Sequence, residues 1–111
     1  MSTGKPPAYV SEARPDRWVV EGGTALRHEL KELGFRRAFL SSTATLTPQA
    51  PLSFEAMGRL AAALHALGIA FGAGRDWSPS DVVQQLRQDG LFEGSFTEIA
   101  WTGEEWHVRI A

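Results

Sequence analysis

The chain has 111 residues, with 43% hydrophobic and 22% charged side chains and a formal net charge of −2. These values are typical of one globular domain with a single core. The absence of cysteine excludes a disulfide framework and a thiolate metal site. The small net charge gives no general attraction to nucleic acid or to anionic membranes, and no apolar run approaches the roughly 20 residues of a membrane span.

The first residues, MSTGKPPAYVSEARPDR, lack the apolar stretch of a signal peptide, so we expect a cytoplasmic protein. Arginine outnumbers lysine and alanine is abundant, a composition that suggests a bacterial or phage origin. Prolines and small polar residues predict a flexible N-terminal arm over residues 1–16, although Tyr9 and Val10 could dock as a short edge segment. Residues 17–111 would then form the single domain.

Three segments end with the same pattern: a leucine, three further residues, a glycine and an apolar residue. The glycines are Gly34, Gly68 and Gly90. A glycine in this position takes the positive φ of a helix C-cap, and the apolar residue after it packs back on the leucine. The pattern predicts three helices, at residues 24–33, 54–67 and 79–89.

Polar residues that favour N-caps precede the same three segments. Thr24, Ser53 and Ser78 are the expected caps. At the third helix, Pro79 takes the first helical position and Asp81 places a carboxylate near the positive end of the helix dipole. The start of the third helix is therefore the best specified.

Short apolar segments between the helices predict strands at residues 17–21, 35–46 and 69–71. The last segment predicts a β-hairpin, with strands 95–101 and 106–110 joined by a type II′ turn at Gly103 and Glu104.

The hairpin register follows from matching side chains across the two strands. Trp101 pairs with Trp106, Ile99 with Val108 and Thr97 with Ile110 on one face, while Glu98 pairs with Arg109 and Ala100 with His107 on the other. We interpret the two tryptophans as a core pair and the Glu98 face as solvent-exposed. Together the elements predict an α+β fold: a small, mostly antiparallel sheet of four to five strands with three helices on one face, ending in a β-hairpin.

The histidines do not form a metal or catalytic signature. His28 lacks a second histidine four residues later, as a helical metal site would require. His107 with Glu98 and Arg109 has the groups for acid–base chemistry, but such a pattern on a sheet face more often keeps an edge soluble. We therefore predict no metal and no cofactor, and we favour a non-enzymatic protein.

The segment Gly72-Ala73-Gly74 links an apolar stretch to the start of the third helix. Backbone N–H groups at such a place favour anions, and Arg75 and Ser78 would complete a weak anion-binding site. The third glycine of a dinucleotide fingerprint and the lysine of a P-loop are absent, and Pro79 lacks an N–H. A flexible link is the competing interpretation.

Periodicity does not place Trp18 and Trp77 in the core. Each follows an arginine or aspartate, a composition typical of protein-binding hot spots, with Arg75 as a further candidate. It equally suits a half-buried tryptophan whose indole N–H reaches a loop carbonyl.

The sequence thus favours a small non-enzymatic protein-interaction module, such as a regulator, an inhibitor or an immunity-type partner of another protein. The alternative is a small-molecule or phosphate-binding domain centred on residues 72–78, with His107 and Glu98 as candidates for any enzymatic activity. A third hypothesis is a homodimer formed through the edge strand at residues 106–110. Nucleic acid and membranes are not expected partners.

Overall fold

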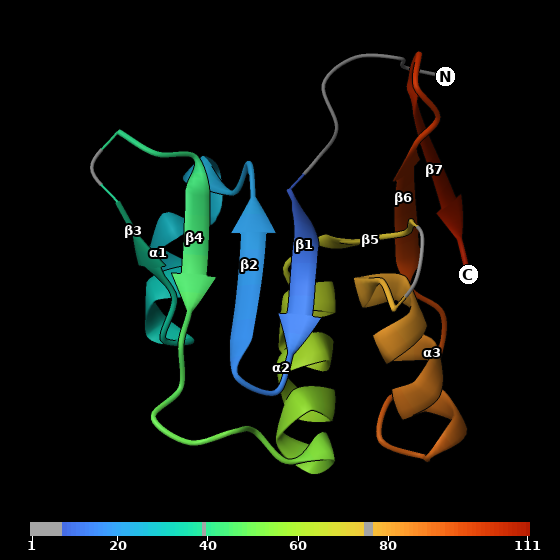
Figure 1. Cartoon of the computed structure of the whole chain (residues 1–111), viewed down its shortest axis with the longest axis horizontal. Helices are drawn as coiled ribbons and strands as arrows, with labels where there is room; N and C mark the ends of the chain where they lie inside the picture. The colour runs from blue at the N-terminus through green and yellow to red at the C-terminus, as the bar shows by residue number, and fades with distance from the viewer. Residues whose placement is uncertain (1–7, 39, 75–76) are drawn as a thin grey trace.

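The computed structural model describes residues 8–38, 40–74 and 77–111 as a seven-stranded mixed sheet with three α-helices (Figure 1). The strands are β1 (Tyr9–Arg14), β2 (Arg17–Glu21), β3 (Arg36–Arg37), β4 (Thr43–Leu46), β5 (Ala70–Gly72), β6 (Thr97–Trp101) and β7 (Trp106–Ile110). The helices are α1 (Arg27–Glu32), α2 (Phe54–Ala66) and α3 (Pro79–Gln88), with a 3-10 helix, η1 (Thr24–Leu26), before α1. The α+β class is confirmed.

The sheet is larger and less uniform than predicted. Its strand order is β3-β4-β2-β1-β5-β6-β7. β5 pairs in parallel with both β1 and β6, and the other pairs are antiparallel. In Figure 1, β5 runs across the view from β1 towards β6, with α1 and α2 behind the left half of the sheet. α3 packs against α2, β1 and β5.

The expected N-terminal arm is wrong for residues 9–14, which form β1 near the middle of the sheet. Val10 and Ala13 are buried in the core, and β1 pairs with β2 along its length. The register shifts at Ser11, where a bulge interrupts the strand alternation that would have revealed the strand in the sequence. Residues 1–7 of the predicted arm lie outside the described residues.

The predicted strand at residues 35–46 is instead a short antiparallel pair, β3 and β4. The chain turns between them, and Leu40 in that connection has a φ of 62°. Arg36 pairs with Thr45 and Arg37 with Ala44. The apolar alternation of the sequence slips at Arg36 and again before β4, which is where the strand breaks.

The three glycine-capped helix ends are confirmed. Gly34, Gly68 and Gly90 have φ values of 102°, 82° and 75°. The residue after each glycine donates its N–H to the carbonyl of the leucine, in the pairs Phe35–Leu30 (2.9 Å), Ile69–Leu64 (3.1 Å) and Leu91–Leu86 (2.8 Å). Each end therefore forms a Schellman motif, which closes the helix and directs the chain into the core.

Two of the three predicted N-caps are confirmed. Ser53 begins α2 and its hydroxyl oxygen accepts from the Ala56 N–H at 3.1 Å. Ser78 begins α3 with a capping box to Asp81. Thr24 is not a cap. It is the first residue of the 3-10 helix η1, in which the Leu26 N–H donates to the Gly23 carbonyl.

Candidate functional site

The β6–β7 hairpin has the predicted register, but its apolar face is largely open to solvent. Trp101 pairs with Trp106, and Gly103 in the turn has a φ of 98°. On the face expected to be buried, Trp101, Val108 and Ile110 are 54%, 46% and 69% exposed. The interpretation of the two tryptophans as a core pair is therefore wrong.

Glu98, expected on the solvent side of the hairpin, is buried. Ser80, in the first turn of α3, donates its hydroxyl to Glu98 Oε2, and Arg109 Nε lies 2.5 Å from Glu98 Oε1. Both carboxylate oxygens thus have a donor, which a charge requires when it leaves water. α3 supplies a polar partner that strand alternation cannot reveal, so Glu98 is buried as well as Ile99 on the predicted apolar face.

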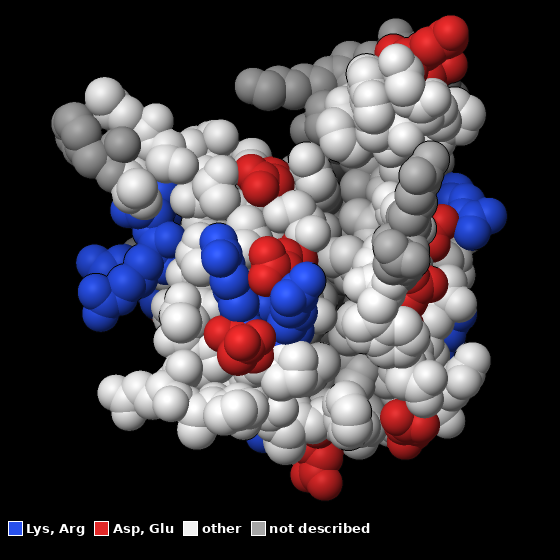
Figure 2. Space-filling view, viewed as in Figure 1, with Lys and Arg blue, Asp and Glu red and all other residues white. Residues whose placement is uncertain are grey.

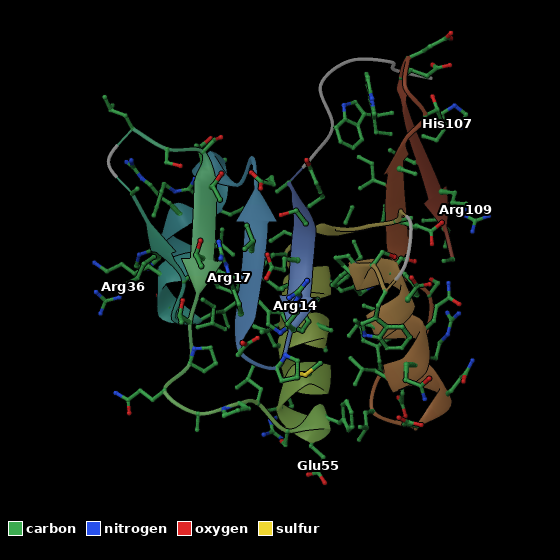
Figure 3. The ribbon with its side chains drawn as sticks, viewed as in Figure 1. Arg14, Arg17, Arg36, Glu55, His107 and Arg109 are labelled. Atoms are coloured by element: carbon green, nitrogen blue, oxygen red, sulfur yellow. The ribbon has the colours of Figure 1, made fainter. Side chains whose placement is uncertain are left out.

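His107 is not brought to the Glu98 carboxylate. Its Nε2 lies 3.7 Å from Glu105 Oε1 at the turn, and both side chains are largely exposed. Figure 3 shows His107 and Arg109 at different levels of β7. Because Ser80 and Arg109 already bind Glu98, the geometry supports an anchoring role for this carboxylate and no acid–base pair with His107.

A groove of about 420 Å³ lies between β1 and the hairpin, beside the short β5. Figure 2 shows this hollow to the right of the charged side chains of β1 and β2. Its aromatic lining consists of Tyr9, Trp77, Trp101 and Trp106. The Trp106 ring centroid lies 5.2 Å from that of Tyr9 and 5.3 Å from that of Trp101, so three rings form one cluster. Burial, and then the charge of Glu21, raise the pKa of Tyr9 above its ordinary value.

Trp77 lies at the junction of this groove and a smaller, apolar cavity of about 230 Å³. Phe54 and Met57 of α2 and Val82 and Leu86 of α3 line the cavity. Trp77 and Phe54 are 65% and 60% exposed. The two hollows and their aromatic rims therefore form a continuous surface, which the sequence did not reveal because its residues come from distant segments.

Trp18, the other tryptophan considered as a contact residue, is fully buried in β2. β2 is an interior strand between β1 and β4, and Trp18 packs in the core with Val20. A fully buried side chain cannot contact a partner, so Trp18 does not belong to the candidate surface.

The predicted anion site is assembled only in part. Gly72, Gly74 and Ser78 line the groove, whereas Arg75 lies outside the described residues. The Asp81 carboxylate accepts from the Ser78 N–H at 2.9 Å and from the Ser78 hydroxyl at 2.8 Å. An internal carboxylate thus occupies the start of α3, where an anion would bind. Packing also explains why residue 72 is a glycine, since an added Cβ would lie 2.8 Å from a β1 carbonyl oxygen.

A wider hollow of about 820 Å³ lies at the other end of the sheet, beside α1 and β3. Arg27, Lys31 and Arg36 are exposed around it. Arg37 is engaged within the fold, because it donates to the Gly23 carbonyl at 3.0 Å and also to the carbonyl of residue 41. The structure thus gathers a basic rim near the β3 edge.

Searches with protein-family models, with curated proteins and with solved structures found no match to the chain. Within the ranges that the structure describes, no helix is long and apolar enough to cross a membrane. The same ranges hold no group of three or more histidine, aspartate or glutamate side chains placed to bind a metal ion.

Proposed function

We propose that this chain is a small protein-interaction module that binds a partner polypeptide in the groove between β1 and the hairpin. The observation that carries the proposal is the gathering of Tyr9, Trp77, Trp101 and Trp106 around one open groove. Tryptophan and tyrosine dominate binding hot spots because they offer large contact areas with few rotatable bonds.

The surroundings of the groove support the same proposal. Ser11, Glu12 and Arg14 of β1 place polar groups along one side, while the smaller cavity beyond Trp77 is apolar. An apolar centre with a polar rim is the usual organisation of a protein interface. A partner would place an apolar side chain in the small cavity and lie along the aromatic side chains. A regulator, an inhibitor or an immunity-type protein would work through such a surface.

The alternative, a phosphate-binding or small-molecule domain at residues 72–78, has weaker support. The Asp81 carboxylate already accepts the Ser78 donors at the start of α3. An anion brought there would meet a like charge and would have to replace satisfied hydrogen bonds. The open, aromatic shape of the groove fits a polypeptide better than a compact anion.

The test is selection of a displayed library of random peptides against the folded chain, followed by titration of an enriched peptide. We expect Trp77→Ala and Trp101→Ala each to weaken binding by at least about tenfold, as hot-spot truncations do. Leu40→Ala is the matched control, because Leu40 is 90% exposed and lies outside the groove. This control should bind as the natural chain does.

Two results would contradict the proposal: no enriched peptide, or enriched peptides that bind both tryptophan variants unchanged. A thermal shift with inorganic phosphate or nucleotides that Arg75→Ala removes would instead support the alternative.

A further inference from the structure

Within the described part of the chain, the backbone groups on the outer side of β7 have no strand partner, and their spacing follows from the hairpin register. Phe96 and Ala111 exchange N–H···O bonds at 3.3 and 2.8 Å, and Thr102 N–H donates to the Glu105 carbonyl at 3.0 Å. Because hydrogen-bonded and non-hydrogen-bonded pairs alternate in an antiparallel ladder, His107 and Arg109 bond to β6. The backbone groups of Trp106, Val108 and Ile110 therefore point away from β6.

No strand among the described residues pairs with this side of β7, which is the last strand of the sheet order. The same three residues also carry the apolar side chains of the strand, and Val108 and Ile110 are exposed. β7 contains no proline, and its two charged or titratable residues, His107 and Arg109, both lie on the opposite face. Natural edge strands usually carry prolines or charged side chains that prevent pairing. The apolar face of β7 carries neither.

We propose that β7 pairs antiparallel with β7 of a second copy of this chain, with Val108 opposite the partner's Val108. In this register Trp106 lies opposite the partner's Ile110, so apolar side chains meet on one face. Three outward residues on each copy match three on the other, and each contributes one N–H and one C=O, for six hydrogen bonds. A shift of this register by two residues would pair only two outward residues of each copy and would leave four hydrogen bonds.

The charges of the opposite face fit this arrangement. The register places His107 opposite the partner's Arg109, and each Arg109 is already paired with Glu98 at 2.5 Å. The Glu105 carboxylate lies beside His107 at 3.7 Å. His107 and the partner's Arg109 therefore each have an acidic neighbour on their own chain, which limits any repulsion between them across the symmetry axis.

The paired assembly is one continuous fourteen-stranded sheet, seven strands from each copy, with the two aromatic surfaces on the same side of the new junction. Pairing of two five-residue strands makes a small interface, so its association is weak and depends on concentration in the micromolar range. This inference does not rest on the occupant of the groove, because it uses the outer backbone edge of β7.

The first experiment is sedimentation equilibrium of the full chain over a range of micromolar concentrations. We expect a monomer–dimer equilibrium that Val108→Lys and Val108→Glu each weaken by at least about tenfold, since each places like charges opposite one another. A one-to-one mixture of the two variants should restore the dimer, which also shows that both are folded. Leu40→Lys, an equally drastic change at an exposed residue, should leave the association unchanged.

The second experiment tests the register with cysteines, which the natural chain lacks. Opposite residues of a hydrogen-bonded pair have Cα atoms about 5.5 Å apart, within reach of a disulfide. Val108→Cys should therefore cross-link to itself under mild oxidation. Trp106→Cys should cross-link only when mixed with Ile110→Cys.

A monomer at every concentration would overturn the proposal, as would a dimer that is insensitive to the Val108 variants or that cross-links in another register. Failure of self-pairing is distinguishable from failure of the groove proposal. Trp77→Ala is expected to affect peptide binding and to leave self-association unchanged.

Discussion

The sheet ends at β3 on one side and at β7 on the other, and Arg36 and Arg109 mark these two edges in Figure 3. β3 has two residues, both arginines, and α1 packs against it. β7 has five residues with apolar side chains at alternate positions and no described strand beyond it. Both are edge strands, but they differ in length, in charge and in how they are covered.

This difference indicates which edge is available for association. A short edge that carries charged side chains offers few backbone groups, and a partner must approach past the cations of the basic rim. A longer edge with apolar residues offers a ladder of hydrogen bonds together with side chains that gain from burial. The same sheet thus has one protected end and one end suited to binding.

The largest expected effect comes from breaking the anchor of the β7 end. We expect Glu98→Ala to lower the free energy of unfolding by about 2 kcal/mol, because the buried Ser80 hydroxyl loses its acceptor and Arg109 its partner. Urea unfolding monitored by tryptophan fluorescence measures this loss in the free energy of unfolding. Arg109→Ala should cost less than about 1 kcal/mol, since that side chain is 72% exposed. Equal losses in the two variants would show that Glu98 is not the anchor.

Amide hydrogen exchange should separate the two sides of β7. At low concentration we expect the N–H groups of Val108 and Ile110 to exchange faster than those of His107 and Arg109 by on the order of tenfold, because only the latter bond to β6. Raising the concentration should slow Val108 and Ile110 and leave His107 unchanged. Equal rates along the strand would contradict the hydrogen-bond alternation on which the edge assignment depends.

The helix ends and the hairpin register could be predicted from the sequence because each depends on residues close along the chain. A Schellman motif needs one leucine and one glycine a few residues apart, as Leu64 and Gly68 show. The hairpin pairs are set by a two-residue turn and by side chains directly opposite each other. Local rules of this kind need no knowledge of the rest of the fold.

The orientation of the hairpin and the position of β1 could not be predicted in the same way. Glu98 is buried because Ser80, eighteen residues earlier, meets it from α3. The aromatic groove joins Tyr9 to Trp106 across nearly the whole chain. Trp77 was identified as a candidate contact residue in the sequence, but no spacing along the chain shows that it lies beside the hairpin tryptophans.

A smaller effect tests whether aromatic contacts hold β7 over the groove. A double-mutant cycle with Tyr9→Ala and Trp106→Ala should give a coupling of about 1 kcal/mol in the free energy of unfolding, because the two rings lie 5.2 Å apart between centroids. A cycle of Trp106→Ala with Phe54→Ala, whose ring lies at the other cavity, should give a coupling near zero. Similar values in both cycles would contradict a specific Tyr9–Trp106 contact.

The smallest effect is expected at the protected edge. Arg36→Val makes β3 more apolar, yet it leaves an edge of two residues beside α1 and the remaining basic side chains Arg27 and Lys31. We expect the free energy of unfolding to change by less than about 0.5 kcal/mol, as for most exposed positions. Association measured by sedimentation should also stay as in the natural chain, because two residues cannot replace the ladder that β7 offers. New oligomers of Arg36→Val that persist when Val108→Lys is added would show that charge, and not strand length, protects this end of the sheet.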